Sequence, residues 1–112
     1  MHSLYMLYMS IQTFGRQIQN IKTQLQNLGP MRPGALTCQY RDPKKKIGPF
    51  YQLSYTYRMK SRTEYVRPSF IPQIRKEIAN FRRFKRLTQK WIDLALRLSH
   101  LQIDLAKKSL PK

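Results

Sequence analysis

The sequence predicts an α+β protein in which an N-terminal helix, a three-stranded antiparallel sheet and a long C-terminal helix form a single domain of 112 residues. Three observations predict this order. Apolar residues recur every three or four positions toward both ends of the chain, apolar and polar residues alternate in the middle, and proline and glycine cluster where the pattern changes. We expect the two helices to pair as an antiparallel, coiled-coil-like stalk.

The first helix is predicted over residues 1–28 by a heptad repeat. Gly29-Pro30 ends it, because glycine suits a helix C-terminus and proline cannot continue the hydrogen-bond ladder. The repeat leaves open whether this helix pairs within its own chain or between chains. Its apolar residues, spaced alternately by three and four, are Leu4, Leu7, Ile11, Phe14, Ile18, Ile21, Leu25 and Leu28.

The sheet is predicted over residues 34–67. Residues 36–41 and 50–57 alternate between apolar and polar side chains, and residues 63–66 are rich in strand formers. We expect Met59, Lys60 and Ser61 to form the turn before the third strand. The second strand then divides between two faces, with Tyr51, Leu53, Tyr55 and Tyr57 on one and Gln52, Ser54, Thr56 and Arg58 on the other.

The second helix is predicted over residues 70–108. Ile92, Leu96 and Ile103 widen its apolar surface beyond what one partner helix covers. We therefore expect a homodimer, or a partner protein bound through the helices. The main apolar stripe consists of Ile74, Ile78, Phe81, Phe84, Leu87, Trp91, Leu94, Leu98, Leu101 and Leu105.

The charge of the chain points to a polyanionic partner. Lys and Arg number 22 against five Asp and Glu, which gives a formal net charge of +17. The bases concentrate in residues 32–67 and 68–112. Such an excess of cations repels itself in a compact protein and attracts anions. We therefore expect non-catalytic binding of nucleic acid, with duplex DNA favoured because strands fit its major groove.

The candidate nucleic-acid-binding residues divide into two roles. Lysines and arginines in loops contact phosphates, whereas Gln, Thr and Arg on an exposed strand read base edges. The candidates in the sheet region are Arg41, Lys44, Lys45, Lys46, Gln52, Thr56, Arg58, Lys60, Arg62 and Arg67. Those on the second helix, which fall on one side at helical spacing, are Arg75, Arg82, Arg83, Arg86 and Lys90.

Other readings stay open at this point. Outward-facing tyrosines would stack on the bases of a single strand. The protein could also be an RNA-binding structural subunit of a ribonucleoprotein complex, or a helical scaffold for an acidic protein partner. The cations on the second helix could simply form a solvated face, although such a face usually mixes both signs of charge.

Several classes of protein are excluded or disfavoured. One cysteine cannot form an internal disulfide, and Cys38 with two distant histidines cannot complete a four-ligand zinc site. No apolar run approaches the roughly 20 residues that span a bilayer. The acidic residues show no paired spacing suited to catalysis. We expect no enzyme, no metal and no cofactor, and a cytoplasmic protein without a signal peptide.

The middle of the chain contains a set of short motifs that together resemble a known family. The motifs are Gly34-Ala35-Leu36-Thr37, Gln39-Tyr40-Arg41, Gly48-Pro49-Phe50-Tyr51-Gln52-Leu53-Ser54-Tyr55, Lys60-Ser61-Arg62 and Tyr65-Val66-Arg67-Pro68. The chain resembles, over roughly residues 29–100, a prokaryotic family of small basic proteins of uncharacterised function found near mobile elements.

The resemblance implies an accessory role beside a mobile element and no enzymatic activity. Many relatives carry a cysteine cluster, which looks metal-binding, between the Tyr-Arg and Gly-Pro motifs. This chain has Asp42-Pro43-Lys44-Lys45-Lys46-Ile47 there instead, so a metal role does not transfer.

Overall fold

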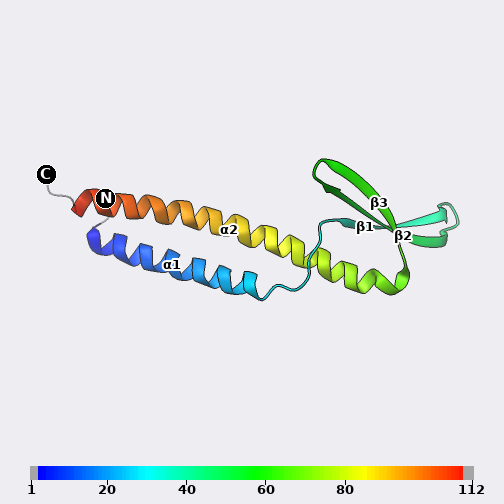
Figure 1. Cartoon of the computed structure of the whole chain (residues 1–112), viewed down its shortest axis with the longest axis horizontal. Helices are drawn as coiled ribbons and strands as arrows, with labels where there is room; N and C mark the ends of the chain where they lie inside the picture. The colour runs from blue at the N-terminus through cyan, green and yellow to red at the C-terminus, as the bar shows by residue number, and fades with distance from the viewer. Residues whose placement is uncertain (1–2, 110–112) are drawn as a thin grey trace. The chain divides into compact units, whose positions relative to one another are not determined.

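The computed structural model describes residues 3–109 and confirms the predicted α+β order (Figure 1). The chain forms two compact units. We call residues 28–83 the sheet unit, and residues 3–27 with 84–109 the helical unit. The elements are α1 (Leu4–Gln26), β1 (Ala35–Asp42), β2 (Ile47–Tyr57), β3 (Lys60–Val66), a 3₁₀ turn (Pro68–Phe70) and α2 (Ile71–Ser109), which contributes to both units.

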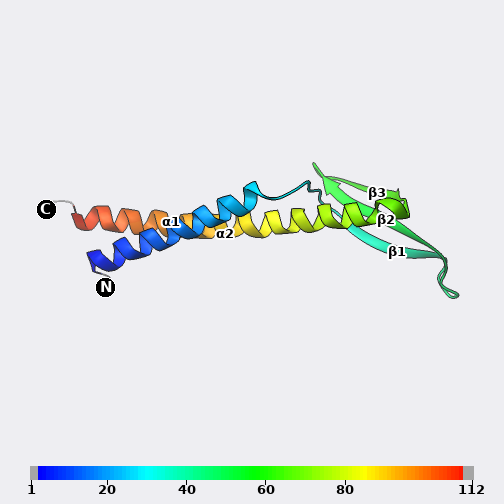
Figure 2. The same cartoon turned by 90° about the horizontal axis from the view of Figure 1, so that it is seen from below.

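The helical unit is an antiparallel pair of helices, as predicted. In both views α1 runs beside the C-terminal part of α2 (Figures 1 and 2). Ser3 caps α1, since its hydroxyl accepts a hydrogen bond from the Met6 amide at 3.2 Å. The Lys22 ammonium lies 5.3 Å from the centroid of the Trp91 ring. The buried residues of the pair lie at the predicted heptad positions: Leu7, Ile18, Ile21, Leu87 and Leu94.

The ends of α1 differ slightly from the prediction. The helix stops at Gln26, and the amide of the C-cap residue Asn27 bonds to backbone carbonyls of the last turn. Leu28 therefore lies beyond the helix but stays half-buried. Leu4 is exposed, so the buried contacts of the repeat begin at Leu7.

The sheet unit contains the second core. Its sheet has the order β1-β2-β3 with antiparallel pairing, and Leu36 and Glu64 flank Leu53 on the two neighbouring strands. Leu53 is only 1% exposed, and its face of the sheet packs on the first turns of α2. We call this the inner face. Its buried core is Leu53, Val66, Ile71 and Ile78, and the partly buried side chains around it are Leu36, Tyr51, Tyr55 and Ile74.

The segment that leads into the sheet is fixed to α2. The Asn80 amide donates to the Pro30 carbonyl at 2.9 Å, and the Arg32 amide donates to the Glu77 carbonyl at 3.2 Å. Gly34 follows with a φ of 146°, and a Cβ there would lie 2.7 Å from a methyl group of Leu53. Glycine therefore lets β1 start directly against the core.

The predicted turn before β3 is wrong by one to two residues. The turn consists of Arg58 and Met59, with φ values of 50° and 65°, while Lys60 and Ser61 already belong to β3. Positive φ at both central residues is the geometry of a two-residue type I′ hairpin. The sequence does not indicate this turn, because neither Arg58 nor Met59 is the Gly or Asn that usually occupies such a position.

Neither described helix is long and apolar enough to cross a membrane.

Candidate nucleic-acid interface

The face of the sheet opposite the core is polar. Register places Gln52 between Thr37 and Tyr65, and alternation continues this set along all three strands. We call it the outer face. Two cross-strand pairs of hydroxyls interact on it, at 3.3 Å between Ser54 and Thr63 and at 3.0 Å between Thr56 and Ser61. Its paired members are Ala35, Thr37, Gln39, Phe50, Gln52, Ser54, Thr56, Ser61, Thr63 and Tyr65.

The outer face carries no carboxylate among the described strands. Asp42 and Glu64 are the two acidic residues of β1, β2 and β3. Asp42 alternates with Leu36 and Glu64 pairs with Leu53, so both belong to the inner face. The outer face therefore offers hydrogen-bond donors and acceptors without repelling an anion.

The dimensions of the sheet match a groove of duplex DNA. The eleven residues of β2 extend roughly 35 Å, which is close to one turn of the double helix. Three strands spaced by about 4.8 Å measure about 10 Å across, while the major groove is about 12 Å wide. The outer face can therefore lie along a major groove.

Cations gather at one end of the outer face, where β1 turns into β2. Arg41, Lys44, Lys45 and Lys46 form this first cation cluster, and all four are exposed. The Asp42 carboxylate accepts a hydrogen bond from the Lys45 amide at 3.3 Å, which holds the turn. Gly48 has a φ of 69°, and a Cβ there would lie 3.2–3.3 Å from carbons of the Arg41 side chain. The Arg41 stem is thus packed against the strand beside it.

A second cation cluster lies at the other end of β2. Arg58, Lys60 and Arg62 line a cavity of about 300 Å³ together with Tyr55 and Tyr57. The Arg58 guanidinium lies 5.2 Å from the Tyr57 ring centroid, within cation–π distance. The two turns occupy opposite ends of the sheet (Figure 1). Arg41 of the first cluster alternates with Gln39 of the outer face, whereas Lys60 and Arg62 pair with Tyr57 and Tyr55 and so lie on the inner-face side of the sheet.

Arg58 itself is not on the outer face, contrary to the prediction. Its positive φ places it in the turn, where the alternation of the strand has ended. The structure instead makes Arg58 part of the second cation cluster. Gln52 and Thr56 lie on the outer face as predicted from their spacing.

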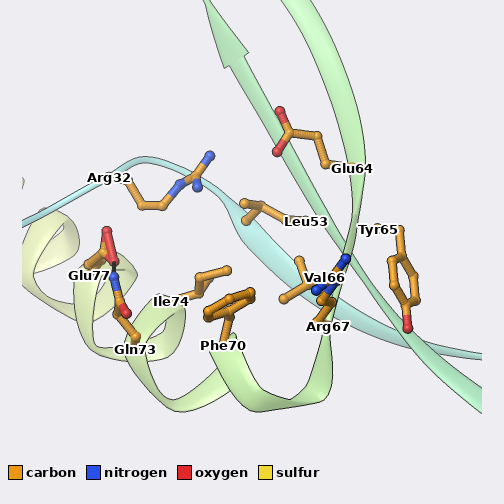
Figure 3. Close-up of a pocket in the computed structure, with 10 residues that line it drawn as sticks. All are labelled: Arg32, Leu53, Glu64, Tyr65, Val66, Arg67, Phe70, Gln73, Ile74 and Glu77. Atoms are coloured by element: carbon orange, nitrogen blue, oxygen red, sulfur yellow. Dashed lines mark hydrogen bonds between the residues drawn. The ribbon is translucent and has the colours of Figure 1, made fainter.

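Arg67 lies in a different environment, at the cavity drawn in Figure 3. This cavity of about 430 Å³ lies between β3 and the start of α2. Glu64 accepts a hydrogen bond there from the Tyr55 hydroxyl at 3.0 Å, and Glu77 accepts one from the Gln73 amide at 3.2 Å. The two carboxylates balance Arg32 and Arg67 at its wall, so this cavity offers phosphate no excess of positive charge.

The predicted cations of α2 divide between the two units. Arg75 and Arg82 line a cavity of about 310 Å³ with Leu36, on the inner side of the sheet. The Arg75 guanidinium lies 5.9 Å from the Tyr51 ring centroid. Arg83 is exposed at the end of the sheet unit. The sheet unit therefore does not bring these three arginines onto the outer face.

Arg86 and Lys90 belong to the helical unit. They line a cavity of about 470 Å³ with Lys85, Gln89 and Asp93. The Gln89 amide donates to the Asp93 carboxylate at 3.4 Å. A carboxylate thus lies among these cations, as Asp42 does in the first cation cluster. These cations belong to the helical unit and are not part of the sheet.

The tyrosines of β2 do not form an outward stacking platform. Tyr51 and Tyr55 pack around the buried core and Tyr57 belongs to the cavity of the second cation cluster. The exposed aromatic residue of the outer face is Tyr65, on β3. The sequence alone does not identify most outer-face residues of β1 and β3. Only the strand register shows that they lie beside Gln52 and Thr56.

Within residues 3–109, no group of three or more His, Cys, Asp and Glu side chains is placed to hold a metal ion. The position of Cys38 on the same strand face as Leu36 and Tyr40 predicts a small buried hydrophobic residue, but Cys38 is exposed, so that prediction is wrong. Comparisons with protein-family models, with curated proteins and with solved structures give no match to this chain.

Proposed function

We propose that this protein binds duplex DNA without catalysis, with the outer face of its sheet in the major groove. The observation that carries the proposal is a carboxylate-free, mostly polar face on a sheet that has a cation cluster at each end. In this arrangement the first cation cluster contacts phosphates at one end of the occupied stretch of groove, and the long side chains of the second cluster reach phosphates at its other end. Gln52 and Thr56 face the base edges. Phosphate contacts supply affinity and base contacts supply sequence choice.

Electrostatics makes this binding strongly dependent on salt. The two cation clusters contain seven lysines and arginines. Each neutralised phosphate contributes about 0.9 to the slope of log K against log salt concentration. If most of the seven contact phosphate, we expect a slope between about −4 and −6.

The shape of the sheet favours DNA over double-stranded RNA. The major groove of A-form RNA is deep and narrow, so side chains on a broad sheet cannot reach its bases. B-form DNA offers a groove of the required width. The inward packing of Tyr51 and Tyr55 also removes the platform that single-strand binding would use.

The proposal extends to the setting in which the protein acts. The resemblance of its motifs to basic proteins found near mobile elements supports an accessory role beside such an element. A chain with a lone cysteine needs no oxidising compartment, which agrees with a cytoplasmic location.

The first test compares nucleic acids by fluorescence anisotropy in a salt titration. We expect the full chain to bind a DNA duplex of about two turns more tightly than single-stranded DNA or an RNA duplex. Equal and weak binding to all three would reduce the interaction to charge attraction. Preferential binding of the RNA duplex would favour a ribonucleoprotein subunit instead.

A pair of matched variants assigns the phosphate contacts. Changing Lys44 and Lys45 to Gln removes two cations of the first cluster, and we expect the salt slope to fall in magnitude by about 1.8. Changing Arg16 and Lys22 of α1 to Gln removes the same charge from the helical unit. If the slope of log K against log salt concentration falls equally in both variants, the first cluster has no specific place in the interface.

A second pair of variants separates base reading from phosphate contact. We expect Gln52→Ala to narrow the affinity difference between a selected duplex and a scrambled one by about tenfold, with an unchanged salt slope. Gln17→Ala, an exposed change on α1, is the control. If Gln52→Ala keeps the full preference for the selected duplex, the outer face does not read the base sequence.

A further inference from the structure

The C-terminal part of α2 has two heptad seams on different sides. The first seam faces α1 and is buried or half-buried: Leu87, Trp91, Leu94, Leu98, Leu101 and Leu105. The second seam is spaced 4, 3, 4 and 3: Ile92, Leu96, Ser99, Ile103 and Ala106. At about 100° per residue, the two seams are centred roughly 140° apart around the helix.

The second seam is open in the single chain. Ile92 is 53% exposed, Leu96 57% and Ile103 49%, because α1 covers the other side of the helix. A strict heptad spacing of apolar and small residues is the pattern of a helix packed against another helix. The second seam therefore needs a second helical neighbour.

The charges beside the second seam fit a second copy of the same chain. Residues 91–106 contain Asp93 and Asp104 with Arg97 as the only lysine or arginine, in a chain whose net charge is +17. Repulsion between two copies is therefore weak at this segment. An acidic partner protein would instead meet two carboxylates here.

The flanks of the second seam also select the orientation. Asp93, His100 and Lys107 recur at heptad spacing along one flank, and the residues of the other flank, Thr88, Ala95 and Gln102, are uncharged. In an antiparallel pair of helices like flanks meet, whereas in a parallel pair opposite flanks meet. Only the antiparallel pair brings Asp93 close to the partner's Lys107, and flanking charges are what set helix orientation.

We propose that two copies of this protein associate through the second seam of α2, with the two helices antiparallel. The offset that joins Asp93 to the partner's Lys107 places Leu96 against the partner's Ala106. It also places Ile103 against the partner's Ser99, so Leu96 and Ile103 each meet a small side chain. This association is independent of the proposed DNA binding, and each dimer carries two sheet units.

Sedimentation equilibrium of the full chain without nucleic acid tests the association. We expect a mass twice that of the 13.5 kDa chain. Leu96→Glu should give the monomer mass, and Tyr8→Glu on α1 should keep the dimer, although both residues are 57% exposed. A monomeric wild-type chain, or a dimer lost in Tyr8→Glu and kept in Leu96→Glu, would overturn the proposal.

Charge reversal tests the orientation with the helical fold preserved. We expect Asp93→Lys and Lys107→Asp each to weaken the dimer about tenfold, because each reverses two symmetric contacts. The double variant should restore it. Residues 93 and 107 lie about 21 Å apart along one helix, so rescue arises only between chains. A double variant weaker than either single one would contradict the antiparallel pairing.

Discussion

At the scale of single residues, Gly34 at the start of β1 determines how closely the chain packs against Leu53. Gly34 combines a φ of 146° with a close approach to Leu53, the most buried side chain of that unit's core. Any side chain at residue 34 would strain the backbone and push Leu53 out of place. Leu53 would then pack less closely against the other core residues, Val66, Ile71 and Ile78.

We therefore predict that Gly34→Ala destabilises the protein by about 1–3 kcal/mol. Gly15→Ala is the matched control, because it lies within α1 and a Cβ there meets nothing within 4 Å. That change should stabilise the protein by about 0.5–1 kcal/mol. Urea denaturation of the full chain measures both. A neutral Gly34→Ala would mean that Leu53 can shift without cost.

Residue patterns predicted the core better than the interface. The heptads and the alternation of β2 identified Leu53, Ile78, Leu87 and Leu94, since burial follows directly from apolar periodicity. The outer face depends on which residues of three strands lie side by side. That register is set by long-range pairing and by the turns, which one sequence does not display.

At the scale of elements, the hairpin between β2 and β3 sets the position of the second cation cluster. Arg58 and Met59 both adopt positive φ, which non-glycine residues adopt at a cost. The two-residue turn fixes Lys60 opposite Tyr57 and Arg62 opposite Tyr55. A longer turn would shift the register and place different side chains on each face.

We predict that Met59→Gly is more stable than Met59→Val by about 1–2 kcal/mol, because a β-branched residue is poorly tolerated at positive φ. Met59 is 97% exposed, so neither change removes a core contact. Thermal denaturation measures the difference. Equal stability of the two variants would place the turn at other residues.

The elements themselves follow from the sequence to different degrees. Both helices were predicted within two residues at nearly every end, because prolines and a glycine flank them. The turn at Arg58 was not predicted correctly. Arg58 therefore lies in the second cation cluster and not on the outer face, where the alternation of the strand predicted it. A turn that lacks its usual residues leaves only the pairing of its strands as a guide.

At the scale of the whole molecule, the net charge of +17 acts against folding as well as toward a partner. Both effects are electrostatic, and salt screens both, with a Debye length of about 10 Å at 0.1 M. The same ions should therefore stabilise the free protein and weaken its complex.

We predict that the melting temperature of the free protein rises as NaCl increases, while its affinity for duplex DNA falls. Differential scanning fluorimetry and anisotropy over one salt series give both quantities. A melting temperature that falls with added salt would mean that favourable ion pairs, and not repulsion, dominate the charge of the fold.

Lysine footprinting by acetylation and mass spectrometry, with and without a DNA duplex, tests directly whether the sheet binds DNA. We predict that the duplex protects Lys44, Lys45, Lys46 and Lys60, at the two ends of the sheet, and leaves the reactivity of Lys76 and Lys107 unchanged. Protection of Lys76 with no change at the two cation clusters would contradict it.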